Sequence, residues 1–179
     1  MQRKKTVVKK VLTDRQVMQN FVAKRRPTLI GVKKLMKTIW GMVVPAQTRA
    51  DIINGYKLTP EQIMRKGKIP VLFKGNEPRY GCYQMSSVLY SALKELGLRP
   101  RMTRFFVSTG VPHTTIIFSL NGRLYEADTF YGSQLNRVDD VRLKQIKEAQ
   151  RLKKFKFIKP GQYTKAMYDR ERKTGNLAV

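Results

Sequence analysis

The chain has 179 residues, which fits one domain with extensions, and 41% of them are hydrophobic, enough for a buried core. Its 37 Lys and Arg residues against 12 Asp and Glu give a net charge of +25, so the surface carries a positive field that attracts phosphates or acidic surfaces. One cysteine cannot form an intramolecular disulfide, and with one histidine it cannot supply the four ligands of a structural zinc site. We therefore expect no metal and no other cofactor.

The N-terminus does not resemble a targeting signal. Lys9 and Lys10 interrupt the apolar residues of the segment Met1 to Leu12, so it lacks the continuous apolar stretch of a secretory signal. The longest apolar run, Ile39 to Val44, is far shorter than a membrane span of ~20 residues. We expect a protein without a membrane span that resides in the cytoplasm or elsewhere inside the cell.

Positive charge is concentrated at the two ends of the chain. Residues 1–37 carry a net charge of +11 and residues 142–179 carry +9, which leaves +5 for the centre. We predict three parts: a basic helical N-terminal extension over 1–44, a core over 45–160 and a basic C-terminal tail over 161–179.

Two helices are predicted in the N-terminal extension. Thr13 and Gln16 form a capping box that begins the first, and Pro27 opens the second. Apolar residues recur at helical spacing in both, namely Val17, Met18, Phe21 and Val22, then Ile30, Leu35, Met36 and Ile39. Their basic outer faces suit either a nucleic-acid clamp or a solvated surface above the core, and both interpretations stay open. Trp40 is interpreted as a core residue.

Two further helices follow in the core. Thr59 and Pro60 are capping residues for a short helix that ends near Gly67. From Gly81 a stronger pattern predicts a helix that ends at Gly97, with a single apolar stripe formed by Met85, Val88, Leu89, Ala92, Leu93 and Leu96.

The period then changes to two, which indicates β-strands. Met102–Ser108, His113–Leu120 and Arg123–Phe130 are rich in β-branched and aromatic residues and are separated by turn residues, so they predict an antiparallel meander. Asn121-Gly122 is a strong signal for a two-residue hairpin turn. A helix over Val138–Leu152, a strand over Lys153–Ile158 and a final helix over Tyr163–Arg172 complete the prediction.

Cys82 falls at the first turn of the strongest predicted helix. Unpaired backbone amides and the helix dipole favour negative charge there, so a thiolate is stabilised. Cys82 also shares the buried stripe of Met85 and Leu89, which predicts that it faces the sheet. This position suits a nucleophile.

The predicted hairpin brings two further polar residues together. With Asn121-Gly122 as the turn, the numbers of opposed residues add to 243, so Thr115 faces Asp128 and His113 faces Phe130. His113 and Asp128 then lie on one face as diagonal neighbours about 7–8 Å apart at the backbone. The register predicts that their side chains meet.

The chemistry of these three residue types suggests acyl transfer. Cys82 would attack an acyl carbon, and His113 would take the thiol proton and later protonate the leaving group. Asp128 would orient the imidazole and stabilise its cation. Glu126 points the same way as Asp128 but lies further from His113, which makes it the weaker candidate for the orienting acid.

These residues resemble the motifs of the transglutaminase-like superfamily. Gly81-Cys82 through Leu96-Gly97-Leu98-Arg99-Pro100-Arg101 resembles its nucleophile helix, although Tyr80 replaces a glycine. Pro112-His113 resembles the start of its histidine strand, and Tyr125-Glu126-Ala127-Asp128-Thr129 resembles its aspartate strand. The order Cys, His, Asp matches, with separations of 31 and 15 residues.

The resemblance implies an α+β, papain-like core in which a helix carrying the nucleophile packs on an antiparallel sheet. Relatives include peptidases, protein cross-linkers, amidases and members that have lost activity, so it implies a protein or peptide substrate. An oxyanion hole would combine the Cys82 amide with a side-chain donor, for which the candidates are Asn76, Gln47 and Trp40. Arg79 and Tyr80 border the nucleophile and could raise its thiolate content or contact substrate.

A second class of function remains open beside the enzyme. The two basic arms could bind nucleic acid or an acidic partner on an inactive module of the same fold. Aromatic residues also alternate with arginines in a pattern that could stack single-stranded bases, formed by Tyr80, Tyr83, Tyr90, Phe105 and Phe106 with Arg79, Arg101 and Arg104. We favour ordinary core aromatics beside solvated arginines, because the aromatics occur at core-type periods.

Overall fold

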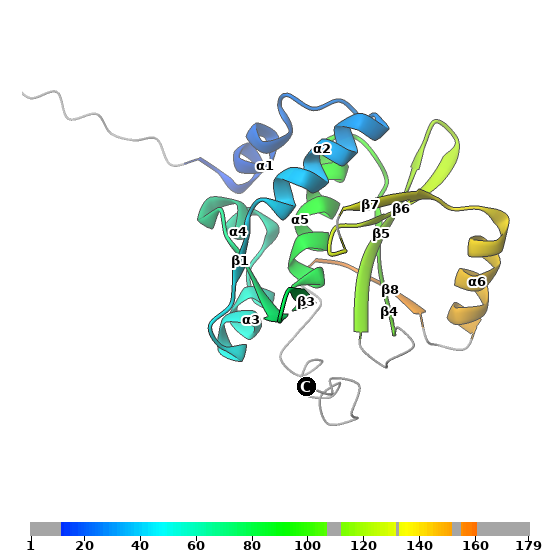
Figure 1. Ribbon diagram of the computed structural model, residues 1–179. Helices are drawn as coiled ribbons and strands as arrows, with labels where there is room; N and C mark the ends of the chain where they lie inside the picture. Colours follow the sequence, from blue (N-terminus) through cyan, green and yellow to red (C-terminus); the bar gives the residue numbers. More distant parts are fainter. Residues whose placement is uncertain (1–11, 107–111, 132, 152–154, 161–179) are drawn as a thin grey trace, which may run out of the picture.

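The computed structural model describes residues 12–106, 112–131, 133–151 and 155–160. Helices and strands alternate irregularly along the chain (Figure 1). In order they are α1 (Asp14–Val22), α2 (Leu29–Trp40), β1 (Val43–Pro45), α3 (Arg49–Tyr56), α4 (Pro60–Lys66), β2 (Ile69–Lys74), β3 (Glu77–Tyr80), α5 (Cys82–Glu95), β4 (Arg101–Phe106), β5 (Pro112–Leu120), β6 (Arg123–Asp128), β7 (Gln134–Arg137), α6 (Asp140–Arg151) and β8 (Phe155–Ile158).

The larger sheet has five strands in the order β7-β6-β5-β4-β8, and every neighbouring pair is antiparallel. The predicted meander β4-β5-β6 is confirmed. Asn121 and Gly122 have φ values of 50° and 73°, as a type I′ turn requires. The pairs from Ile116 with Ala127 to Leu120 with Arg123 have the predicted register.

Helices cover both faces of this sheet. Figure 1 shows α5 between the five-stranded sheet and the smaller elements, with α6 at the opposite side of the sheet. Met102, Ile116 and Ala127 belong to the main core cluster with α5, whereas Ile117 and Ile146 form a second cluster under α6. The fold is therefore α+β, with the helix that carries Cys82 packed on an antiparallel sheet.

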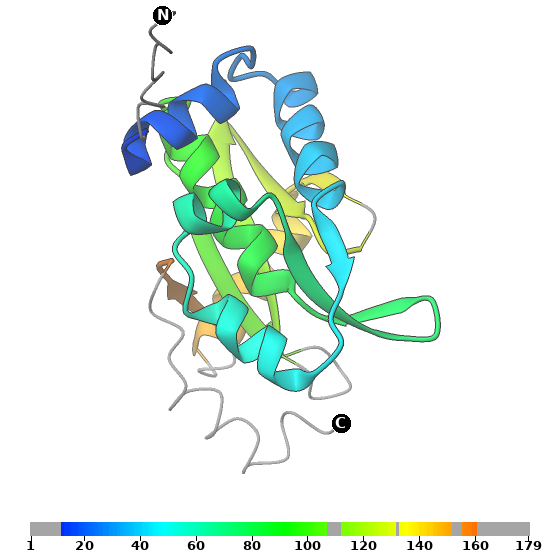
Figure 2. The same cartoon turned by 90° about the vertical axis from the view of Figure 1, so that its left-hand side faces the viewer.

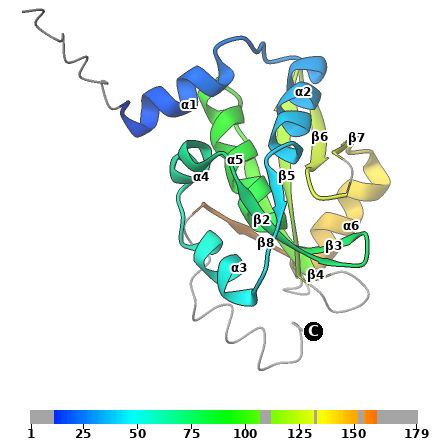
Figure 3. The ribbon, with the colours of Figure 1, turned by 60° about the vertical axis from the view of Figure 1, so that its left-hand side comes forward.

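A smaller sheet leads into the start of α5. Its order is β1-β2-β3, with β1 parallel and β3 antiparallel to β2. Figure 3 shows β2 and β3 beside the N-terminal end of α5. Sequence patterning did not predict β1, α3, the β2–β3 hairpin or β7.

The N-terminal helices pack on the same core as the sheet. Met18 and Val22 of α1 and the buried side of α2 join the cluster that contains α5. Figure 2 shows the ribbons of α1 and α2 near α5. The capping box of Thr13 and Gln16 is confirmed. The predicted start of α2 at Pro27 is wrong by two residues, because Thr28 is the N-cap and accepts the Gly31 amide at 3.1 Å.

Other predicted elements end as expected or lie outside the described ranges. Gly67 ends α4 in the left-handed conformation. The predicted helix over Tyr163–Arg172 lies outside the described residues, as does the tail over 161–179. Within the part of the chain that the structure describes, no helix combines the length and apolarity needed to cross a membrane.

Candidate active site

Cys82 is the first residue of α5, as its pattern predicts. Gly81 is the N-cap, with φ 135°, and a Cβ there would lie 2.5 Å from Cγ2 of Val71. Glycine is needed at this junction because it alone adopts such a φ readily and leaves room for Val71. Among the residues that the structure describes, no side chain caps the helix, so the first-turn amides beside Cys82 suit an anion.

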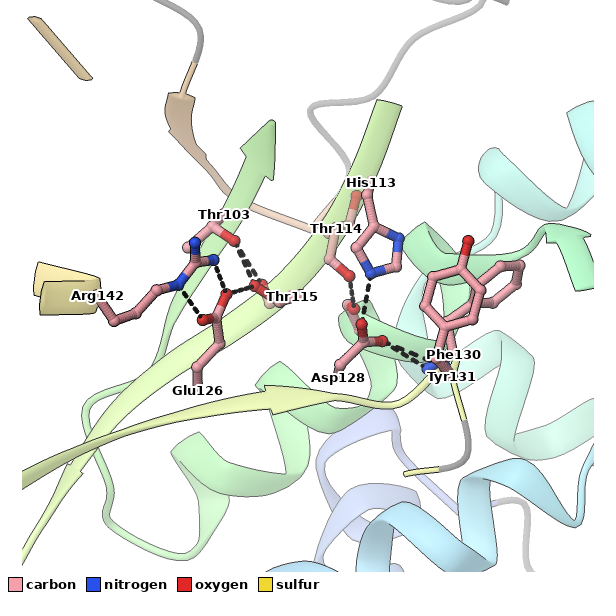
Figure 4. Close-up of polar contacts among 10 residues, drawn as sticks. Thr103, His113, Thr114, Thr115, Glu126, Asp128, Phe130, Tyr131 and Arg142 are labelled. Atoms are coloured by element: carbon pink, nitrogen blue, oxygen red, sulfur yellow. Dashed lines mark hydrogen bonds and ion pairs between the residues drawn. The ribbon is translucent and has the colours of Figure 1, made fainter. Parts of the chain in front are cut away.

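His113 and Asp128 meet across the β5–β6 hairpin, as the register predicts. Nε2 of His113 lies 2.6 Å from Oδ2 of Asp128 (Figure 4). The other carboxylate oxygen, Oδ1, accepts the backbone amide of Phe130 at 2.9 Å. Asp128 is thus fixed by the chain that follows it while it holds the imidazole.

Cys82 and His113 are both buried and influence each other's charge. Each is 5% exposed, so water screens their interaction weakly. Burial alone would raise the pKa of the Cys82 thiol, but a hydrogen bond with His113 and the charges of His113 and Arg104 lower that pKa below its ordinary value. Since Asp128 engages Nε2, a hydrogen bond to the sulfur would use the other ring nitrogen, Nδ1.

The pKa of His113 shifts upward, opposite to that of Cys82. Burial disfavours the imidazolium, yet hydrogen bonds to Asp128 and Cys82 raise the pKa of His113 to about 10. A lowered thiol pKa and a raised imidazole pKa together favour a thiolate–imidazolium pair. This is the activated form of a cysteine nucleophile.

Aromatic rings enclose the imidazole on several sides. Phe105 on β4 meets His113 edge-on, with ring centroids 5.5 Å apart. Phe130 and Tyr131 follow Asp128 and have centroids 5.9 and 5.2 Å from His113. Tyr131 is 47% exposed, so it forms the solvent side of this enclosure. Such rings restrict the rotation of the imidazole and can stabilise its cation.

Arg104 is a charged residue of the site whose position the sequence interpretation missed. We expected the arginines near the aromatics to be solvated, but Arg104 is only 7% exposed. Its Nη1 donates to Thr114 Oγ1 at 3.2 Å, in the layer between the sheet and α5. The alternation of side chains along β4 could have predicted this burial, because Arg104 lies on the same face of the strand as the apolar Met102.

Glu126 binds different partners from Asp128. Its carboxylate accepts from Arg142 at 2.8 and 3.0 Å and from Thr115 Oγ1 at 2.8 Å (Figure 4). Thr115 also contacts Thr103 Oγ1 at 2.7 Å. This network joins α6 to the sheet and leaves Asp128 as the acid that contacts His113.

The structure does not bring Asn76 to Cys82. Gly75 and Asn76 connect β2 and β3, and Asn76 is exposed at the tip of this hairpin. Figure 2 shows the hairpin projecting from the body. The length of β3 separates the tip from Cys82, about 3.3 Å for each residue.

The other upstream candidates lie in different surroundings. Trp40 ends α2 and packs, partly buried, against the main core. Gln47 is exposed and follows Ala46, whose amide donates to the carbonyl of Val71, the residue that contacts Gly81. Within the described ranges no hydrogen bond joins Trp40, Gln47 or Asn76 to the three site residues.

The two residues before Gly81 end strand β3. Tyr80 pairs with Leu72 and packs partly buried against the main core. The side chain of Arg79 lies outside what the structure describes. Tyr80 therefore contributes to the wall beside the start of α5.

Comparison with known proteins bears on the fold. No protein-family model matches the chain, and no curated protein matches its sequence. A solved structure described as the crystal structure of a TGase matches with a TM-score of 0.50 and 16% sequence identity. The match covers 74% of this chain and 36% of that one, so the chain spans about a third of its length. The chain thus has an α+β fold similar to part of a transglutaminase.

Proposed function

We propose that the protein is a transglutaminase-like cysteine hydrolase or acyltransferase that acts on amide bonds of a protein or peptide. The observation that carries the proposal is the 2.6 Å contact between His113 and Asp128 next to the buried Cys82, which is the first residue of a helix. The opposed pKa directions of the thiol and the imidazole, and the likeness in fold to a TGase structure, support it.

The first half of the reaction forms a thioester. The Cys82 thiolate attacks the amide carbon, and the carbonyl oxygen takes up negative charge in the tetrahedral intermediate. His113, already protonated, gives its proton to the leaving nitrogen as the carbon–nitrogen bond breaks. Asp128 stabilises the imidazolium until that transfer.

The second half returns the enzyme to its starting state. An acceptor, either water or an amine, loses a proton to the neutral His113 as it attacks the thioester carbon. The carbon–sulfur bond then breaks, which regenerates the thiolate beside the imidazolium. Hydrolysis and cross-linking differ only in the acceptor.

The oxyanion would be held at the start of α5. The Cys82 amide belongs to the first helical turn, so it lacks an intrahelical acceptor and suits one half of an oxyanion hole. Gln47 is the side-chain donor we favour for the other half, because its segment contacts Val71 beside Gly81.

Labelling with iodoacetamide tests the activated nucleophile. Cys82 is the only cysteine, so alkylation of the native protein reports on this sulfur alone, and Cys82→Ala gives the blank. Wild type should react at neutral pH at least about tenfold faster than His113→Ala, because the thiolate is the reactive species. Equal rates in two folded proteins would sink the proposal.

A basic binding module of the same fold is the second candidate. Beyond the charged arms, a groove of about 700 Å³ is lined by four cationic residues and two acidic ones: Arg15, Lys57, Lys94, Lys159, Glu61 and Glu95. Binding of a DNA or RNA oligonucleotide through such charges should weaken log-linearly with salt. Undetectable or salt-insensitive binding at low ionic strength would remove this candidate.

A further inference from the structure

Arg104 lies in the layer where α5 meets the sheet. Along β4, Met102 and Arg104 share one face, and Met102 is fully buried against α5. Arg104 itself is 7% exposed, and its guanidinium donates to Thr114, the residue paired with it on β5. A buried guanidinium is costly to desolvate, so its charge acts strongly on any anion nearby.

Two contacts show which end of α5 lies over Arg104. Ser87 Oγ contacts Met102 Sδ at 3.8 Å, and Ser86 Oγ donates to the carbonyl of Thr114 at 3.0 Å. Cys82 is one helical turn before Ser86, about 6 Å along the axis, and His113, whose charge acts on the Cys82 thiol, is the residue before Thr114. Moving from Met102 toward Arg104 therefore follows α5 toward its first residue.

We infer that Arg104 is a second cation for the Cys82 thiolate, which acts from the core side of the site while His113 acts from the side of Asp128. The inference rests on the proposed function and adds a positioning residue to it. Arg104 touches no substrate, because the layer between helix and sheet covers it. It would instead favour the charged form of the sulfur.

The two cations differ in one property that matters to the reaction. His113 loses its charge when it protonates the leaving group, whereas a guanidinium keeps its charge at every accessible pH. Arg104 would thus sustain a fraction of thiolate whatever the protonation state of the imidazole. The direction of the Cys82 pKa agrees, since the charge of Arg104 contributes to lowering it.

The test follows the pH dependence of Cys82 alkylation by iodoacetamide, a neutral probe whose approach is insensitive to protein charge. Arg104→Met should slow alkylation at neutral pH about tenfold and move the midpoint of the profile to higher pH. Arg104→Lys should restore most of the rate, because it restores the charge.

Arg101→Met is the matched control. Arg101 lies on the same strand but on the opposite face, with its guanidinium carbon 3.4 Å from the ring centroid of Phe157. It removes the same charge from the protein as Arg104→Met, so it should leave the alkylation profile unchanged. Arg104→Met and Arg101→Met with the same profile would overturn the inference.

Two further variants keep the test decisive. If Arg104→Met does not fold, Arg104→Gln replaces it, because it also removes the charge but keeps a polar side chain beside Thr114, and a profile identical to wild type would overturn the inference. Failure of the proposed function has a different signature, because His113→Ala would then alkylate as fast as wild type. A slow His113→Ala with an unaffected Arg104→Met refutes the inference alone.

Discussion

Nε2 of His113 and Oδ2 of Asp128 are 2.6 Å apart although the two residues lie on different strands, 15 positions apart in sequence. Asp128→Asn keeps the shape of this contact and removes its charge. The imidazolium then loses its counter-ion, so the thiolate fraction falls and iodoacetamide alkylation at neutral pH should slow about tenfold. Glu126→Gln is the matched control, because it neutralises a carboxylate on the same strand that bonds Arg142 instead. Similar rates for Asp128→Asn and wild type would contradict the role of Asp128.

The single histidine gives a direct readout of the site. His113 alone supplies imidazole signals in NMR spectra, and they should report a pKa of about 10 where an ordinary histidine titrates near 6.5. Asp128→Asn should lower this pKa, because a hydrogen bond to Asp128 raises it. A titration near 6.5 in the wild-type protein would contradict the imidazolium form of the pair.

The same shifts predict how stability depends on pH. A raised His113 pKa contributes stability that is complete below pH 6.5 and is lost as the pH rises toward about 10. The lowered pKa of Cys82 acts oppositely, since its contribution is lost as the pH falls through the folded value. Cys82→Ser removes the second effect together with the part of the His113 shift that Cys82 causes, so the hydrogen bond to Asp128 should still make its free energy of unfolding by urea fall between pH 6.5 and 9. A flat profile would argue against a proton held by folded His113.

Gly81, the residue before Cys82, is expected to tolerate no side chain. Gly81→Ala forces a Cβ to within 2.5 Å of Val71 at a φ of 135°, which should cost about 1–3 kcal/mol in the free energy of unfolding. Gly97→Ala is the control, because its φ is 79° but nothing lies within 4 Å of the added Cβ. Adding Val71→Ala should recover the steric part of the loss. Equal costs at Gly81 and Gly97 would show that Val71 does not constrain the junction.

The Glu126–Arg142 pair is expected to hold α6 on the sheet. Arg142→Met leaves a carboxylate with 13% exposure without its bidentate partner, which should cost about 1–2 kcal/mol after allowance for the partial exposure of Arg142. Arg151→Met removes an exposed pair with Glu148 on the same helix and should change stability little. Urea unfolding of the two variants makes the comparison, and equal losses would contradict a special role for Glu126.

Local signals explain what could be predicted from the sequence. The Asn121-Gly122 turn fixes the register of two strands, so the meeting of His113 and Asp128 followed from counting residues. The stripe and glycine signals of α5 placed Cys82 at its start. These features depend on residues close in sequence, where turn and capping chemistry dominate.

The features that were missed depend on contacts between distant segments. β1 has only three residues and pairs in parallel with β2, so no local pattern reveals it. Arg104 is buried because α5 covers its face of β4, and its charge alone suggests a solvated position. The rings around His113 come from β4 and from the chain after β6, which only the tertiary fold brings together.

The Asn121-Gly122 turn also sets a rule for how this chain can change in length. Strand faces alternate with every residue, so one residue inserted on either side of the turn would carry Asp128 to the face opposite His113 unless a bulge absorbed it. Changes of two residues would restore the face but shift the carboxylate along the strand. Among related chains that keep the three residues, this hairpin should therefore be almost invariant in length, while the β2–β3 hairpin is free to lengthen or shorten at its tip.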